Sequence, residues 1–121
     1  MTENDFDTWA SKFGGAWAML DPTGALSMLS KDVEYYETAF SPPCKNFDEV
    51  EKLWRVITTN QENVTFKHDV VMTQGNMGLI HWRVTRTTVP EGANQEFDGV
   101  FLVRLNDEGL CTMFKQWRAQ R

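Results

Sequence analysis

Three glycine-containing turns divide the second half of the chain into long, regular segments. They are Gln74-Gly75-Asn76, Pro90-Glu91-Gly92 and Asn106-Asp107-Glu108-Gly109. The stretches between them are rich in Val, Ile, Thr, Phe and Trp, which are the residues that favour strands. We therefore predict an antiparallel meander of four long strands, over residues 64–73, 78–89, 95–106 and 110–118.

The first half of the chain has helical periodicity instead. Apolar residues recur at three- and four-residue steps over residues 6–20, which predicts one long amphipathic helix. Asp21-Pro22 is typical of a helix start and opens a short second helix. Residues 32–38 favour a strand. Asn46, followed by Glu49 three residues later, resembles a capping box and predicts a third helix.

The predicted order is helix, helix, strand, helix and four strands, in a chain of 121 residues without a linker or an internal repeat. This order indicates a single α+β domain over residues 1–121, with its helices on one face of one sheet. A long, twisted sheet that folds over helices tends to enclose a cavity. A pocket is therefore the natural place to look for function.

Charge and composition exclude several classes of function. The net charge of −5 argues against a nucleic-acid binder, and we interpret Lys115, Arg118 and Arg121 as a solvated end rather than a basic patch. No segment approaches the ~18 apolar residues of a membrane span, so no membrane partner is expected. The acidic N-terminal residues do not resemble a secretory signal. We expect a cytoplasmic protein in which Cys44 and Cys111 stay reduced.

Sites built on short motifs are not indicated. The sequence contains no Gly-x-Ser-x-Gly motif of a serine nucleophile. Its two histidines are far apart, and no His or Cys pair has the spacing of metal ligands. Phe13-Gly14-Gly15-Ala16 lies within the first predicted helix and lacks the glycine pattern of a phosphate loop. We therefore expect neither a metal nor a cofactor.

Three local patterns, taken in order, resemble the nuclear transport factor 2-like superfamily, which includes SnoaL-type polyketide cyclases, ketosteroid isomerases and scytalone dehydratases. These patterns are Leu26–Val33, Glu37–Trp54 and Phe97–Gly109, and the resemblance covers nearly the whole domain. It implies a cone-shaped, curved antiparallel sheet wrapped on the N-terminal helix, the cystatin-like α+β roll, with a hydrophobic pocket at the wide end. It also implies a small-molecule ligand and a homodimer that forms through the sheet.

Glu37 is the first candidate for a catalytic role. The resemblance aligns it, without a gap over residues 31–54, with the carboxylate that shuttles protons in ketosteroid isomerases. Independently, a carboxylate near a strand end, beside Tyr35, Tyr36 and Phe40, would lose part of its hydration. This loss raises the pKa of a carboxylate toward useful general-base values. The alternative interpretation is a surface glutamate at the end of an edge strand.

The rest of the isomerase apparatus does not transfer to this sequence. Phe101 aligns with the acid on the penultimate strand, and Phe13 lies near the position of the tyrosine that polarises the substrate carbonyl. Neither phenylalanine can donate or accept a proton, which argues against a steroid-isomerase oxyanion hole. A binding module that performs no chemistry, or a homodimeric interaction domain of the same fold, therefore remains an alternative.

Strand alternation indicates which polar groups could reach the pocket. Asp98 lies between apolar residues and is expected on the opposite face, unless a bulge reverses the alternation. If Trp82 points inward, His81 lies on the outer face of the sheet. In the reverse register, His81 and Arg83 become pocket groups capable of proton transfer or anion binding. We retain His81 as the second catalytic candidate, and we expect His68 to be a hydrogen-bonded core histidine.

Large aromatic residues are the candidates to line the cavity, although most aromatic residues in a small domain simply form its core. If they border a void, the ligand is expected to be apolar and planar, with few polar anchors. The leading hypothesis is a cofactor-independent isomerase, lyase or cyclase that uses Glu37 as an acid/base. The candidate ligand-binding residues are Trp17, Tyr35, Trp54, Phe66, Trp82, Phe101, Phe114 and Trp117.

Overall fold

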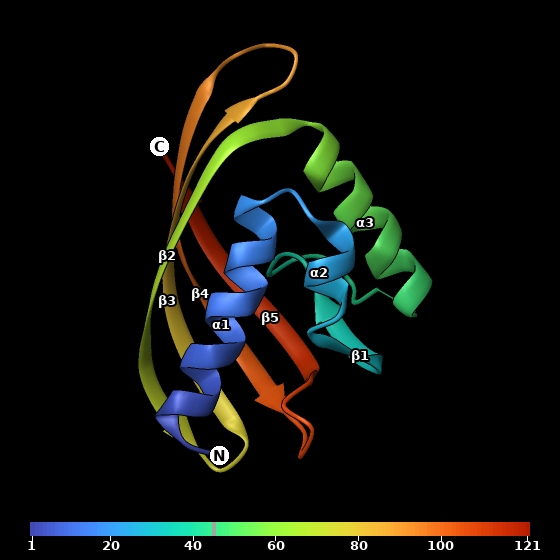
Figure 1. Ribbon diagram of the computed structural model, residues 1–121, viewed down its shortest axis with the longest axis vertical. Coiled ribbons are helices and arrows are strands. Elements are labelled where there is room, and N and C mark those ends of the chain that lie inside the picture. The colour runs from blue at the N-terminus through green and yellow to red at the C-terminus, as the bar shows by residue number, and fades with distance from the viewer. Residues whose placement is uncertain (45) are drawn as a thin grey trace.

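The computed structural model describes residues 1–44 and 46–121, and in this part of the chain three helices cover one face of a curved, five-stranded sheet (Figure 1). The α+β architecture that the sequence predicts is confirmed. The helices are α1 (Glu3–Ala18), α2 (Pro22–Leu26) and α3 (Phe47–Thr59). The strands are β1 (Leu29–Tyr36), β2 (Gln61–Gln74), β3 (Met77–Thr88), β4 (Asn94–Leu105) and β5 (Cys111–Gln120).

The sheet has the strand order β1-β5-β4-β3-β2, and β2 to β5 form the predicted meander. Its three turns contain Gly75, Gly92 and Gly109 at φ angles of 59°, 73° and 77°, a conformation that glycine adopts at little cost. The expectation of a wholly antiparallel sheet is wrong for one pair, because β1 runs parallel to β5. Helix α3 carries the chain from the β1 edge to the β2 edge, and the meander then returns to β1.

The second and third helices begin at their predicted caps. Asp21 accepts a hydrogen bond from the backbone N–H of Gly24 at 3.0 Å. Asn46 likewise accepts one from the backbone N–H of Glu49 at 3.0 Å. Each bond satisfies an N–H group that the first helical turn leaves unpaired. No helix among the described residues is long and apolar enough to cross a membrane.

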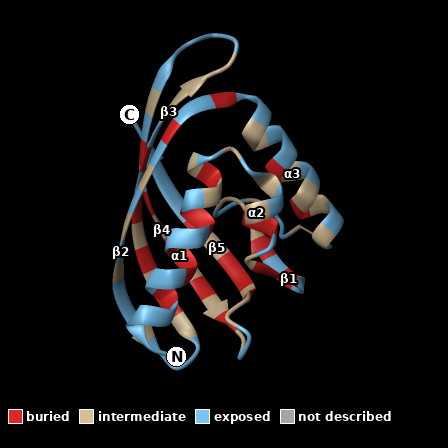
Figure 2. Cartoon of the chain, viewed as in Figure 1, coloured by how far each residue is buried: buried red, intermediate tan, exposed pale blue. Residues whose placement is uncertain are grey.

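Helix α1 lies against β2 and β3, and its apolar stripe forms the centre of the core (Figure 2). Gly14 allows this close approach, because a Cβ atom at that position would overlap the ring of Phe66 on β2. Glycine inside a helix costs about 1 kcal/mol relative to alanine, and here the packing of Phe66 offsets that cost. The buried residues of this stripe are Phe6, Trp9, Ala10, Phe13, Gly14 and Trp17.

Alternation along the strands determines which side chains face the helices. On β3 the inward side chains are those of Ile80, Trp82 and Val84, all essentially inaccessible to solvent. Trp82 pairs with Gly99 on β4, and Gly99 pairs with Arg118 on β5. Side chains of directly paired residues lie on the same face of a sheet. Trp82 and Arg118 therefore share the concave face of the sheet.

Candidate functional site

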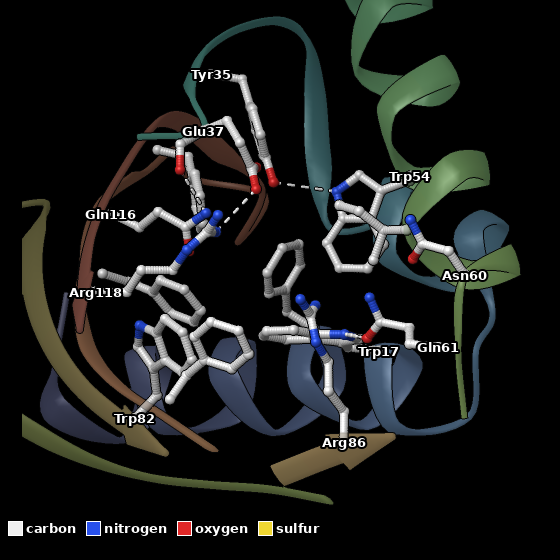
Figure 3. A pocket seen from close by; sticks show the side chains of 15 residues that line it. Trp17, Tyr35, Glu37, Trp54, Asn60, Gln61, Trp82, Arg86, Gln116 and Arg118 are labelled. Atoms are coloured by element: carbon white, nitrogen blue, oxygen red, sulfur yellow. Dashed lines mark hydrogen bonds and ion pairs between the residues drawn. The ribbon is translucent and has the colours of Figure 1, made fainter. Parts of the chain in front are cut away.

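A pocket of about 140 Å³ lies between the concave face of the sheet and helices α1 and α3 (Figure 3). A cavity of roughly 150 Å³ is enough to hold a benzene-sized molecule. The pocket is partly open to solvent, and its volume accommodates one ring. Six of the eight aromatic residues that the sequence suggested for ligand binding line this pocket: Trp17, Tyr35, Trp54, Trp82, Phe101 and Phe114.

The other two suggested aromatic residues lie elsewhere. Phe66 is not part of the pocket wall and packs between α1 and the sheet, with its ring stacked 6.2 Å from that of Phe101. Trp117 lies on the outer face of the sheet and is 43% exposed. The alternation of β5 explains this placement, because Gln116 and Arg118 point inward on either side of it. The prediction that Phe66 and Trp117 line the pocket is therefore wrong.

Glu37 lies in the wall of the pocket, one residue beyond the end of β1. Its Oε1 accepts a hydrogen bond from Nη1 of Arg118 at 3.1 Å, and its backbone carbonyl accepts one from Nε2 of Gln116 at 2.6 Å. The side chain is only 22% exposed. Its Oε2 is buried and has no hydrogen-bond partner among the described residues. The pocket therefore contains a sequestered carboxylate oxygen that is free to accept a proton.

Burial raises the pKa of Glu37 above its ordinary value of 4.5, and this effect of desolvation is the largest. The hydrogen bond and the positive charge of Arg118 lower the pKa in part, and the Tyr35 hydroxyl and Gln116 act in the same direction. The predicted contribution of Phe40 is wrong, because that side chain is fully exposed. The pocket itself, rather than the loop after β1, removes water from the carboxylate.

The Tyr35 hydroxyl lies beside the Glu37 carboxylate and accepts a hydrogen bond from Nε1 of Trp54 at 3.2 Å (Figure 3). As a nearby donor it lowers the pKa of Glu37, although its geometry is not that of a full hydrogen bond to Oε2. Burial, followed by the negative charge of Glu37, raises the pKa of Tyr35 well above 10. Tyr35 is therefore neutral, with a proton available for donation. Its ring stacks on Phe114 at 4.5 Å, which fixes its orientation.

Two arginines that the sequence analysis did not place in the site line the pocket. Arg118, interpreted above as part of a solvated end, pairs with Glu37 instead. Arg86 lies on β3 in the same phase as Trp82 and Val84, and its Nε donates to Oε1 of Gln95 at 2.8 Å. Burial and the charge of Arg118 lower the pKa of Arg86, whereas Glu37 opposes this shift. The alternation that places Trp82 inward was the signal that could have identified Arg86.

Trp82 occupies space that glycine leaves open on the neighbouring strand. Its Cζ2 atom is 2.9 Å from the position that a Cβ atom on Gly99 would take. The indole N–H of Trp82 is buried and has no partner among the described residues. By contrast, the indole N–H of Trp17 donates to Oε1 of Gln61 at 2.7 Å. The pocket wall thus contains one unpaired donor as well as the unpaired oxygen of Glu37.

Of the two registers that the sequence left open for this strand, the structure has the one in which Trp82 points inward, so His81 lies on the outer face and is corrected as a candidate catalytic residue of the pocket. There its Nε2 is 2.8 Å from Oδ1 of Asp98, and Nε of Arg83 donates to Oδ2 of Asp98 at 2.9 Å. His81, together with Arg83, holds the pKa of Asp98 below its ordinary value. His68 contacts Asp7 of α1 through Nε2 at 2.8 Å, with a side chain that is 13% exposed.

The side chains that line the pocket are suited to proton transfer. They include a carboxylate with a raised pKa, a neutral phenol and two guanidinium groups. The described residues include no cluster of three or more His, Cys, Asp or Glu side chains arranged to hold a metal ion. Cys44 and Cys111 are both free thiols.

Comparison with solved structures finds the same fold in proteins of low sequence identity. One such structure has a TM-score of 0.84 and 12% identity, and the match covers 97% of this chain and 92% of that one. Its description names the epoxide hydrolase/cyclase-like enzyme SalBIII and a role in pyran ring formation in the polyether salinomycin. A ketosteroid isomerase-like protein from Erwinia carotovora atroseptica has a TM-score of 0.75 and 14% identity, with coverage of 96% and 95%. A conserved protein from Planctomyces limnophilus has a TM-score of 0.79 and 14% identity, with coverage of 98% and 97%.

No curated protein matches the chain. The model of the SnoaL-like domain family, in contrast, matches residues 10–113. This range includes the second half of α1, strands β1 to β4, the start of β5, and Glu37, Trp82 and Arg86 of the pocket. The chain therefore belongs to the SnoaL-like domain family.

Proposed function

We propose that this protein is a cofactor-independent isomerase, lyase or cyclase that acts on a small, largely apolar ring compound, with Glu37 as the acid/base. One observation carries this proposal: Oε2 of Glu37 is buried without a partner in the wall of a ring-sized pocket. A carboxylate in such a position is poorly hydrated, and this makes it a stronger base than a solvated one.

The proposed reaction begins when Oε2 of Glu37 removes a proton from the substrate. The electron pair of the broken bond then moves toward a substrate oxygen, where negative charge develops. The neutral hydroxyl of Tyr35 and the guanidinium of Arg118 lie close enough to Glu37 to stabilise that charge. In an isomerase, Glu37 returns the proton to another substrate atom. In a lyase or cyclase, the electrons expel a leaving group or close a ring.

The solved structures support the reaction class at the level of the fold. The descriptions of two of them name an epoxide hydrolase/cyclase-like enzyme and a ketosteroid isomerase-like protein. A shared fold accommodates different chemistries, so the site residues must decide the reaction. The pocket volume of about 140 Å³ favours a substrate whose reacting ring fits within the pocket.

The proposal can be tested with nitrobenzisoxazole, a small aromatic probe that reports on a desolvated base. Glu37 would remove the proton on the ring carbon, the electrons of that C–H bond would complete the nitrile, and the N–O bond would break to release a coloured cyanophenolate. We expect the Glu37→Gln variant to lose about 100-fold in rate, within the range typical of general-base catalysis. The absorbance of the phenolate measures the rate directly.

Glu34→Gln is the matched control for this experiment. Glu34 lies on β1, three residues before Glu37, but its side chain is 58% exposed and faces Arg104 at 3.8 Å, away from the pocket. This variant should keep the full rate. Equal rates for the wild-type protein and the Glu37→Gln variant would contradict the proposed role of Glu37.

A ligand-binding module without catalysis is the second candidate. It is favoured by Phe13 and Phe101, which are both buried and form an edge-to-face pair with ring centres 5.9 Å apart in the pocket wall. Neither offers the proton that a second acidic group would supply. If this candidate is correct, the probe binds with Trp fluorescence changes but reacts no faster than in the Glu37→Gln variant.

A further inference from the structure

The charged groups that line the pocket do not balance. Glu37 is its acidic residue, whereas Arg86 and Arg118 both contribute positive charge. Arg118 is paired with Glu37 at 3.1 Å. Arg86 is therefore left without a carboxylate partner among the described residues that line the pocket, and the site carries one uncompensated positive charge.

The surroundings of Arg86 hold its side chain in place without neutralising it. Its Nε donates to the neutral amide of Gln95 at 2.8 Å, and its guanidinium carbon lies 4.5 Å from the centre of the Phe97 ring. The guanidinium of Arg118 lies over the same ring at 5.8 Å. The terminal nitrogens of Arg86 make no hydrogen bond with any residue that the structure describes. They remain available for a ligand.

Arg83, on the same strand but outside the pocket, differs from Arg86 in having a carboxylate partner. It is 68% exposed and pairs with Asp98 at 2.9 Å, although solvent alone could stabilise its charge. Arg86 is less exposed and has no such acid. A guanidinium that is partly withdrawn from water and lies near a second cation is costly to maintain. A bound anion would relieve both the lost hydration and the repulsion from Arg118.

We propose that Arg86, assisted by Arg118, binds the carboxylate of a ring-containing organic acid, and that the ligand of this pocket is therefore an apolar single-ring compound with one carboxylate. This inference rests on the proposed function for the pocket it shares, and it adds the substrate class. The free terminal nitrogens of Arg86 form the planar fork that fits a carboxylate with two hydrogen bonds. A singly charged ligand also matches the single uncompensated charge.

The geometry gives such a ligand one orientation. Figure 3 shows the Arg86 guanidinium and the Glu37–Arg118 pair reaching into the pocket from different sides. The ring would lie among the aromatic side chains between them, with its carboxylate at Arg86 and its reacting atom toward Oε2 of Glu37. Arg86 is thus a binding residue, and Glu37 remains the residue that exchanges the proton.

Benzoate and benzamide are suitable probes, because they share a ring and differ in charge. Three tryptophans line the pocket, Trp17, Trp54 and Trp82, so intrinsic fluorescence can follow binding. We expect the wild-type protein to bind benzoate about tenfold more tightly than benzamide, as a charged hydrogen bond allows. We expect Arg86→Gln to abolish this preference, because it weakens the binding of benzoate far more than that of benzamide. Arg83→Gln should keep the preference and is the matched control.

The Glu37→Gln variant gives a second readout that does not depend on how well Arg86→Gln folds. Removing the carboxylate leaves two unpaired cations, so this variant should bind benzoate more tightly than the wild-type protein does. The inference is overturned if the wild-type protein binds benzamide as well as benzoate, or if Arg83→Gln and Arg86→Gln reduce the preference equally. Failure of the proposed function looks different: benzoate is still preferred, but Glu37→Gln leaves the turnover of nitrobenzisoxazole unchanged.

Discussion

Trp82 and Arg118 lie on opposite sides of Gly99, in one row across β3, β4 and β5, with the ring of Trp82 in the space above the glycine. A Cβ atom on Gly99 would lie 2.9 Å from Cζ2 of Trp82 and would also overlap the backbone carbonyl of Trp117. Backbone cannot move aside as a flexible side chain can. Gly99 thus links the position of an aromatic wall residue to that of the arginine that pairs with Glu37.

The Gly99→Ala variant should therefore lose stability and alter the pocket. Forcing a methyl group into a packed interior typically costs about 1–3 kcal/mol. Urea unfolding measures this loss, and the fluorescence of the buried tryptophans should change in the folded state. Unchanged stability together with an unchanged spectrum would show that the row can adjust, contrary to this account.

Two adjacent glycines of α1 should respond to alanine in opposite ways. At Gly14 a Cβ atom would overlap the ring of Phe66, whereas at Gly15 it would meet no atom within 4 Å. Gly15→Ala should stabilise the protein by about 0.5–1 kcal/mol through its better helix propensity. Gly14→Ala should destabilise it, because Phe66 must shift. Chemical denaturation of the two variants in parallel is the measurement, and a stabilised Gly14→Ala variant would contradict the close packing.

The pKa of Glu37 predicts how activity depends on pH. If Glu37 is the base, kcat/KM rises with pH as the carboxyl loses its proton, with a midpoint above the ordinary value of 4.5 because burial raises its pKa. Arg118 lowers that pKa in part, so Arg118→Gln should move the midpoint to higher pH. The profile is measured with the uncharged nitrobenzisoxazole. A midpoint that stays in place in Arg118→Gln would argue against Glu37 as the titrating group.

The same shift predicts how stability depends on pH. Because the pKa of Glu37 is raised, the folded protein binds its proton more tightly than the unfolded chain does. The stabilisation that results from this tighter proton binding is complete below the unfolded-state pKa, and it is lost as pH rises through the folded-state pKa. Glu37→Gln should therefore have a higher melting temperature than the wild-type protein near pH 7, and the difference should shrink in acid. A difference that grows in acid would reverse the sign of this argument.

The two cysteines should differ from an exposed thiol in their reactivity. Burial raises the pKa of the Cys111 thiol to about 12, and burial with the charges of Glu49 and Glu37 raises that of Cys44. Because the thiolate is the reactive form, Cys111 should not react with Ellman's reagent in the folded protein, and Cys44 should react slowly. Both should react at once in denaturant. Rapid labelling of Cys111 in the native state would contradict its burial.

The strands and caps could be predicted because local chemistry determines them. Turn glycines at positive φ, and capping side chains such as Asp21 and Asn46, act within a few residues of where they stand in the sequence. The aromatic pocket wall was also largely predictable, because period-two alternation distinguishes Trp82 from His81 once one face is known to be buried.

The polar part of the site was harder to predict, because its contacts join distant parts of the chain. Glu37 and Arg118 are separated by 81 positions, and nothing near either residue specifies the other. From the sequence alone, Arg118 is an ordinary basic residue near the C-terminus. It lies beside Glu37 only because β5 pairs with β1. Phe40 illustrates the opposite error, because an apolar residue close in sequence to Glu37 is fully exposed in the structure.

The parallel pairing of β1 with β5 has a consequence for how the site comes into being. Glu37 follows β1 in the first half of the chain, and its cationic partner Arg118 lies on β5 in the second half, so neither half can assemble a working pocket by itself. Contacts between such distant segments form late, since a long loop must close before they do. We expect partly folded molecules, in which β5 has not yet docked on β1, to have no catalytic activity. Activity therefore requires the complete sheet.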